Sequence, residues 1–454
     1  MSVEIADPRV FEPMQYSPIF PTDTIYPVWD AVCDAILDLD IQGCRAVECF
    51  RYGRDTNDQN PQMVIVTVSP SVKNKFKQTR EQIVGILNHF QLQAVGVSIV
   101  KGEIERSDTF EQWRLPQDGP KEGGHAGLSL GKRGISTSSG TFGGWVEIQD
   151  ATGEWLRLGL TCFHCVDPTK QANIAPPQFL TRWYTHGISA NDADAKKYLR
   201  VDQPSMHDIK NDLAILEKFI KSDRALLQAG ESVNQPDMKE YERIEALLRK
   251  HMVRKSHIEQ FCASENHHLG HVYAGSGYRE KPVLGGYSSW ETTMDWALID
   301  VKDQRVRDND ITVHGTPVIP SIEGLTTLKG WDMAKLLDKY RSGGTECLYK
   351  IGQSTGFTAG WYNSIKSIHV ATRINQHGKE EMKVTKEHAI LGRSGQRFAA
   401  PGDSGSFVFT EKGEVVGMIF AGRKDRNISY FTHISHLFED IKAITGCIGV
   451  RIYA

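Results

Sequence analysis

The stretch APGDSGSFVF (400–409) places Ser404 between two glycines, directly after an aspartate and before a run of apolar residues. Gly402 lets the backbone form a sharp turn, and the apolar run predicts a strand. Two interpretations follow, an ordinary polar turn or a turn that presents Ser404 as a nucleophile. Because a serine hydroxyl is a weak nucleophile, the second interpretation requires a histidine base, an orienting carboxylate and N–H donors for an oxyanion.

A candidate histidine lies earlier in the chain. The stretch TFGGWVEIQDATGEWLRLGLTCFHCV (141–166) predicts two strands around a turn at residues 150–153. His164 lies where this hairpin ends. It is therefore the candidate base for Ser404.

Two aspartates compete for the role of orienting carboxylate. Asp212 lies in NDLAILEKF (211–219) and Asp295 lies in MDWALIDV (294–301). The apolar residues around Asp212 recur at helical spacing: Ile209, Leu213, Leu216 and Ile220. Asp295 instead opens a continuous apolar run, which is typical of a buried strand. Because the orienting aspartate has to face the histidine from a strand edge, we predict this role for Asp295 and a solvated helix face for Asp212.

Four stretches, in chain order, carry a resemblance to a known family. LTCFHCV (160–166), MDWALIDV, PGDSGSFVF and GMIFAG (417–422) resemble the histidine, aspartate and serine motifs and the next strand of chymotrypsin-fold (trypsin superfamily) serine peptidases. YKIGQSTGFTAGWYNSI (349–365) resembles the strand and turn that open the second barrel of bacterial members. The resemblance covers residues 140–446 except for a helical insertion, and the layout also looks like that of intracellular trypsin-like proteins of fungi.

The resemblance implies a fold and a chemistry. The fold class would be mostly β, a chymotrypsin-like double β-barrel with a helical insertion and a small N-terminal α+β domain. The enzyme would be a serine endopeptidase, a hydrolase that works without a cofactor through an acyl-enzyme on a polypeptide substrate, including the chain itself. His164 would be the general base, Asp295 its orienter and Ser404 the nucleophile, with the N–H groups of Gly402 and Ser404 as the oxyanion hole. Ser406 replaces a glycine of many members, which removes no catalytic atom.

The chain divides into three predicted parts. Residues 1–105 form the small α+β domain, in the order helix, strand, strand, helix, strand. Residues 106–140 form a glycine-rich linker. Residues 141–446 form the peptidase domain, with a helical insertion at about 203–265. In the insertion, EALLRKHMVRKSH (245–257) could be a basic partner-binding helix, but its apolar stripe favours an amphipathic helix docked on the barrel. Ser435 is the predicted cap of a C-terminal helix.

Two alternatives compete with the catalytic interpretation. His164 lies between Cys162 and Cys165, and a second cluster contains Cys262, His267, His268 and His271, so either group could bind a metal ion. No paired second knuckle accompanies the first cluster, and the second is expected to be a solvated end of the insertion, so we predict no metal site. A catalytically silent protease fold, kept as a binding or regulatory module, is the rival function. Loss of a triad residue would favour it, and none is lost.

Composition limits the partners and the location. With 53 basic and 56 acidic residues, the chain has no broad electrostatic footprint for nucleic acid or an anionic membrane. Neither a secretory signal nor a run of about 20 apolar residues is visible, so we expect an intracellular, cytoplasmic protein. The eight cysteines are thinly spread and are expected to be reduced thiols, although the family often uses a cysteine beside the histidine in a disulfide.

Substrate preference and activation are predicted from the same resemblance. Phe398 lies six residues before Ser404, where trypsin-type members place an acidic pocket base, so we expect apolar rather than basic side chains at the cleavage site. Trypsin-type activation needs a freed amino terminus that reaches the aspartate before the serine. Cleavage after Arg133, in GKRGIS, would expose Gly134 rather than a branched apolar residue. We therefore expect no activation by cleavage there.

Overall fold

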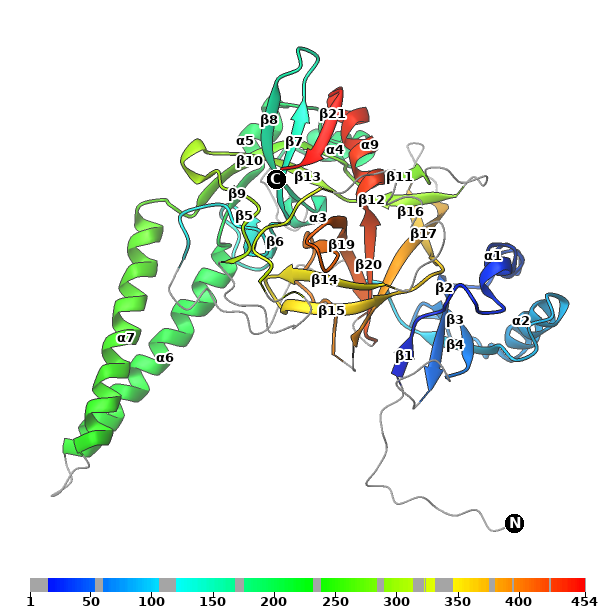
Figure 1. Cartoon of the computed structure of the whole chain (residues 1–454), viewed down its shortest axis with the longest axis horizontal. Coiled ribbons are helices and arrows are strands. Elements are labelled where there is room, and N and C mark those ends of the chain that lie inside the picture. The colour runs from blue at the N-terminus through cyan, green and yellow to red at the C-terminus, as the bar shows by residue number, and fades with distance from the viewer. Residues whose placement is uncertain are drawn as a thin grey trace, which may run out of the picture.

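The computed structural model describes most of the chain, namely residues 15–53, 60–105, 120–167, 175–231, 238–283, 290–312, 322, 324–330, 346–374, 380–393, 396–423 and 426–453. The described strands form two large curled sheets, of thirteen and eight strands, with helices around them (Figure 1). The predicted mostly β class is therefore confirmed. No described helix combines the length and the apolar character that a membrane crossing requires.

The eight-stranded sheet contains the predicted hairpin. Its order is β21 (Gly449–Ile452), β7 (Gly144–Gln149), β8 (Trp155–Thr161), β13 (Ala297–Val301), β10 (His268–Gly275), β9 (Arg200–Asp202), β5 (Ser129–Lys132) and β6 (Gly140–Thr141). The carboxylate of Asp150 accepts hydrogen bonds from the backbone N–H groups of Thr152 and Glu154, at 2.8 and 3.0 Å, and so closes the hairpin turn. Strand β21 lies beyond residue 446, where the predicted peptidase domain ends.

The larger sheet contains a closed ring of six strands. Five neighbours follow in the order β14 (Cys347–Gly352), β18 (Phe407–Phe409), β19 (Val415–Arg423), β20 (Ile428–His433) and β17 (Glu380–Gly392). Strand β15 (Gly356–Tyr362) pairs with both β14 and β17 and closes the ring. Strand β16 (Ser367–Ile374) continues the sheet from β17, and β12 (Glu291–Met294) connects it to β11 (Arg279–Pro282).

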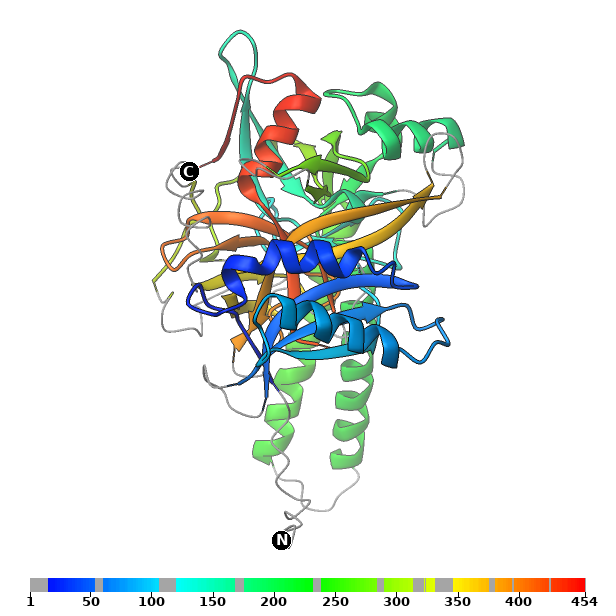
Figure 2. The same ribbon diagram turned by 90° about the vertical axis from the view of Figure 1, so that its right-hand side faces the viewer.

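The N-terminal part of the chain extends this larger sheet. Its elements are β1 (Gln15–Ser17), η1 (Tyr26–Val28), α1 (Trp29–Leu37), β2 (Cys44–Gly53), β3 (Gln62–Val68), α2 (Lys77–His89) and β4 (Gly96–Lys101), which contain the predicted order. Strand β2 pairs with β16, and α1 and α2 cover one face of the extension (Figure 2). A fully buried ion pair, Arg423 Nη1 to Glu48 Oε2 at 3.0 Å, joins the two parts.

Two long helices form an arm that projects from the sheets. They are α6 (Met206–Glu231) and α7 (Met238–Ala263), and both views show the pair extending away from the rest of the protein (Figures 1 and 2). We call this pair the helical arm. Its apolar stripes pack against each other around Ile209, Leu216 and Ile258. The expectation that residues 245–257, which lie in α7, dock on the barrel is therefore wrong, because each helix already buries its apolar face against the other.

Shorter helices connect the strands. They are α3 (Phe163–Val166), α4 (Pro177–His186), α5 (Ala193–Tyr198), η3 (Asp303–Arg305) and the C-terminal α9 (Ile434–Thr445). Helix α9 is capped by His433, whose ring nitrogen Nδ1 accepts from the backbone N–H of Ser435 at 3.3 Å. The prediction of Ser435 as the cap is therefore wrong by two residues. Gly446, with φ at +72°, ends the helix in the left-handed conformation that glycine favours.

Candidate active site

Ser404 lies in a tight turn that leads into β18. Gly402 and Gly405 both have φ at +96°, a conformation that side chains rarely adopt, so the two glycines make the turn possible. Thr141 N donates to Ser404 O at 2.8 Å, and Gly405 N donates to Ile419 O at 2.8 Å. The turn is thus held by β6 of the eight-stranded sheet on one side and by β19 on the other. Ser404 is 4% exposed.

His164 and Asp295 form a buried ion pair. His164 lies in α3, directly after β8, and Asp295 lies directly before β13. These two strands pair with each other, and this pairing brings together side chains that are 131 residues apart in the chain. His164 Nδ1 lies 2.7 Å from Asp295 Oδ2, and the backbone N–H of His164 donates to Asp295 Oδ1 at 3.0 Å. Asp295 therefore determines both the position and the tautomer of the imidazole.

The other imidazole nitrogen is available. His164 Nε2 is buried, and it has no hydrogen-bond partner among the residues that the structure describes. The neighbouring residue Cys165 contacts the serine turn, because its Sγ donates to Ser404 O at 3.5 Å. Within the described part of the chain, the backbone N–H groups of Gly402 and Ser404 also have no acceptor. As far as the structure describes the chain, the site therefore contains a ring nitrogen without a partner, next to the residue that contacts the serine turn, and two N–H groups without an acceptor within that turn.

Burial and charge act on His164 in opposite directions. Burial by itself lowers the pKa of the imidazole, because it disfavours the charged form. The carboxylate of Asp295 favours that form, with a smaller contribution from Cys165, and the net effect raises the pKa of His164 above its ordinary value. The neutral imidazole is therefore a stronger base than that of an ordinary histidine.

The other candidate carboxylate lies elsewhere. Asp212 is in the helical arm, where its Oδ2 lies 2.8 Å from Arg254 Nη2. Asp212 is 2% exposed, so the prediction of a solvated helix face is wrong. The side chain is buried because α7 packs over it and supplies the arginine. Of the two aspartates, the structure brings Asp295 to His164.

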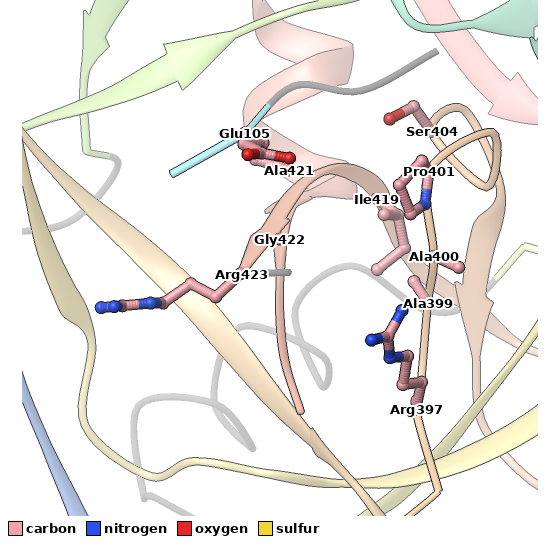
Figure 3. Close-up of a pocket in the computed structure, with 10 residues that line it drawn as sticks. All are labelled: Glu105, Arg397, Ala399, Ala400, Pro401, Ser404, Ile419, Ala421, Gly422 and Arg423. Atoms are coloured by element: carbon pink, nitrogen blue, oxygen red, sulfur yellow. The ribbon is translucent and has the colours of Figure 1, made fainter. Parts of the chain in front are cut away.

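A small pocket of about 40 Å³ borders Ser404. Its walls combine small and apolar residues with charged ones at the margins: Glu105, Arg397, Ala399, Ala400, Pro401, Ile419, Ala421, Gly422 and Arg423 (Figure 3). Phe398 is fully buried and does not line this pocket, whereas its neighbour Arg397 does. Position 398, where trypsin-type members would have an acidic pocket base, is therefore a buried phenylalanine that lies outside the pocket walls.

An extended segment of the chain lies along the pocket. Glu105 N donates to Gly422 O at 3.0 Å, and Gly422 N donates to Glu105 O at 3.1 Å. This pair of bonds is an antiparallel bridge to β19. An extended peptide can add to a strand by the same kind of backbone pairing. The sequence offered no signal for this contact, because it depends on backbone groups alone.

The structure also tests the two metal hypotheses. In the described part of the chain, one group of potential ligands comes together, with atoms of Cys162, His164 and Asp295 within 4.8 Å of one another. His164 and Asp295 already bind each other, and Cys162 Sγ donates to Ile419 O at 3.1 Å. A metal ion would have to replace these bonds. All eight cysteines are free thiols, so Cys162 and Cys165 form no disulfide.

The second cluster does not form such a group among the described residues. His267 Nε2 and His268 Nδ1 lie 3.9 and 3.5 Å from the carboxylate of Asp202. Their side chains are 12% and 15% exposed, so the expectation of a solvated end of the insertion is wrong for these two residues. They are partly covered because β10, which begins at His268, pairs with β9, which contains Asp202.

The dibasic pair before Gly134 is held in structure. Lys132 ends β5 and is 5% exposed. Arg133 N donates to Arg200 O at 2.8 Å, and the guanidinium lies 2.7 Å from Glu265 Oε1. A protease would reach this peptide bond only after local unfolding. The prediction that cleavage after Arg133 brings no activation stays a prediction.

Comparison with known proteins places the chain. No curated protein matches it. Among solved structures, the active form of the Rv3671c protease from M. tuberculosis is 14% identical, with a TM-score of 0.19. The matched region covers 40% of this chain and 66% of the other chain. The family model of peptidase family S64 matches residues 55–449, and the protein therefore belongs to peptidase family S64, a family of hydrolases that act on polypeptides.

Proposed function

We propose that this peptidase is a serine endopeptidase with a triad of Ser404, His164 and Asp295. The observation that supports the proposal most is the buried pair of His164 Nδ1 and Asp295 Oδ2 at 2.7 Å, beside the Ser404 turn. The pair leaves Nε2 of the same ring as the atom that can accept the serine proton. In an enzyme without substrate, the bond between serine and histidine is often long, so its absence among the described residues does not oppose the assignment.

The proposed reaction proceeds in two halves. Ser404 Oγ attacks the carbonyl carbon of the scissile bond while His164 Nε2 takes the hydroxyl proton. The N–H groups of Gly402 and Ser404 donate to the oxyanion of the tetrahedral intermediate. The intermediate collapses to an acyl-enzyme, and Nε2 returns the proton to the leaving amine. Water then attacks the acyl carbon while His164 Nε2 takes its proton. The bond to Ser404 Oγ breaks, Nε2 returns the proton to Oγ, and the carboxylic product leaves, with Asp295 ionised throughout.

The proposal extends to the architecture. The six-stranded ring and the eight-stranded sheet would be the two barrels of a chymotrypsin-like fold. His164 and Asp295 would then come from one barrel and Ser404 from the other. In this proposal the helical arm is the insertion at about 203–265 and residues 1–105 are the N-terminal domain. The predicted linker of residues 106–140 is too long, because it contains β5 and the start of β6 of the eight-stranded sheet.

The substrate would bind as an extended strand along β19. Glu105 supports this, because its two backbone bonds to Gly422 are those that an extended peptide would make beside Ser404. The same contact favours the chain itself as one substrate. Alanine and isoleucine side chains line part of the pocket, and the buried Phe398 is not acidic, so we expect apolar residues at the cleavage site rather than lysine or arginine. Cleavage of a peptide library tests this preference, and a profile dominated by basic residues would contradict it.

Covalent labelling tests the nucleophile. A fluorophosphonate probe should label the purified protein, and the Ser404→Ala variant should lose labelling and about a millionfold in turnover. The Asp212→Asn variant is the matched control, because it changes a buried aspartate outside the site. Labelling that persists after Ser404→Ala would falsify the assignment. A folded wild-type protein without labelling or turnover would instead favour the binding or regulatory module.

A further inference from the structure

Asp403, the residue directly before Ser404, is a fully buried carboxylate. Its Oδ1 accepts from the backbone N–H groups of Ser354 and Thr355, at 2.9 and 3.3 Å. Its Oδ2 accepts from Thr355 Oγ1 at 2.6 Å and from Ala400 N at 2.9 Å. All four groups act as donors, so the arrangement suits the ionised carboxylate, which only accepts. A buried negative charge therefore lies next to the proposed nucleophile.

The counter-charge comes from inside the fold. Lys350, in β14, is fully buried, and its Nζ lies 3.2 Å from Asp403 Oδ2. The ammonium also donates to Gly356 O at 3.0 Å and to Thr355 Oγ1. These three acceptors match the three N–H groups of a charged lysine. Burial lowers the pKa of Lys350, and the carboxylate of Asp403 opposes that change.

The ion pair joins two turns. Asp403 belongs to the turn that contains Gly402 and Ser404, and its partners Ser354 and Thr355 belong to the turn after β14. The turns touch closely, because a Cβ added at Gly402 would lie 2.3 Å from Ser354 Oγ. A displacement of Asp403 would therefore move the N–H groups of its two neighbours.

We propose that Lys350 is a positioning residue for the oxyanion-binding N–H groups of Gly402 and Ser404. Its ammonium neutralises Asp403 and holds the serine turn in the productive geometry, so no freed chain terminus is needed to supply this cation. Lys350 does not touch the substrate and acts through Asp403. The inference rests on the proposed function, because it concerns the same serine turn.

Exchange of the two charges tests the inference. Lys350→Met leaves the carboxylate unpaired, and we expect kcat on a peptide substrate to fall about 100-fold, as when an oxyanion donor is lost. KM should change less than about threefold, because ground-state binding is retained. Asp403→Asn should have a similar effect, since it leaves a buried ammonium unpaired. The double variant contains neither charge, and its kcat should be at least tenfold higher than that of Lys350→Met.

A matched control and a milder variant complete the design. Arg254→Met breaks an ion pair in the helical arm and should leave kcat unchanged. Thr355→Val removes the hydroxyl that bridges the two charges, and its kcat should fall by about tenfold while the protein stays folded. Circular dichroism checks the folding of each variant. If Lys350→Met does not fold, the charge-free double variant and Thr355→Val decide the question.

The outcomes separate the inference from the function on which it rests. A wild-type protein without turnover or fluorophosphonate labelling contradicts the proposed function and the inference together. An active wild-type enzyme contradicts the inference alone in two cases. In the first, folded Lys350→Met or, where that variant does not fold, Thr355→Val keeps a kcat within threefold of wild type. In the second, the double variant is no more active than Lys350→Met or, where that variant does not fold, Asp403→Asn.

Discussion

Two segments with nearly the same letters, DLAI at 212–215 and DWAL at 295–298, take opposite structures in this protein. The first is part of α6 in the helical arm, and the second leads into β13 of the eight-stranded sheet. Both aspartates are buried, at 2% and 1% exposure, and both bind a basic side chain. Burial and pairing therefore do not mark the functional aspartate.

The two aspartates differ in the basic side chain that each of them binds. Asp212 binds the guanidinium of Arg254, which stays protonated in proteins and cannot act as a base. Asp295 binds the imidazole of His164, which can accept and release a proton. The first pair can stabilise a helix–helix contact, and the second can take part in proton transfer. Three predictions test this contrast.

The largest expected difference is in turnover. Asp295→Asn should lower kcat about ten-thousandfold, because the imidazole loses the group that orients it and stabilises its charged form. Asp212→Asn should change kcat less than about threefold. Steady-state kinetics on one peptide substrate compares the two variants, with folding checked by circular dichroism. An inactive Asp212→Asn beside an active Asp295→Asn would reverse the assignment.

A smaller effect is expected in the pH dependence. A general base works in its neutral form, so activity rises as the pH rises through the pKa of His164. Asp295 raises this pKa, so in Asp295→Asn the residual kcat/KM should rise at lower pH than in the wild type. Asp212→Asn should leave the profile unchanged. A profile of Asp295→Asn that stays in place, or moves to higher pH, would show that Asp295 does not act on His164.

The smallest effect is expected in stability. Asp212→Asn removes the charge from a bond between α6 and α7, and this should cost about 1–2 kcal/mol of arm stability. Thermal unfolding followed by helical circular dichroism measures the loss. Arg254→Met should produce a similar loss, since it removes the other partner. Equal stability of wild type and both variants would mean that the pair does not hold the arm together.

The contrast between the two segments also shows how far sequence reasoning reaches. The four letters alone are ambiguous, but the flanking apolar residues repeat with a helical period around Asp212 and run continuously after Asp295. That difference correctly predicted the helix and the strand. The pairing of β8 with β13, which brings His164 to Asp295, agrees with the interpretation but could not be read from either segment.

Other contacts gave no local signal. The docking of the arm helices was mispredicted, because an amphipathic stripe shows that a face is buried but not against what. The bridge of Glu105 to Gly422 uses backbone groups, which every residue has. Lys350 reads as an ordinary strand residue in YKIG, and its role depends on Asp403, to which no periodicity connects it.

The sequence by itself predicted the helices of the arm, the strands next to His164, Asp295 and Ser404, and the three residue types of the candidate triad. These follow from the period of apolar residues and from the glycines of the serine turn, which act over a few neighbouring positions. Only the tertiary structure decided which charges meet. Arg254 with Asp212, His164 with Asp295 and Lys350 with Asp403 are each joined by strand pairing or helix packing over a long stretch of chain. Such pairings depend on the whole fold, because a buried charge is stable only where a distant segment brings its partner.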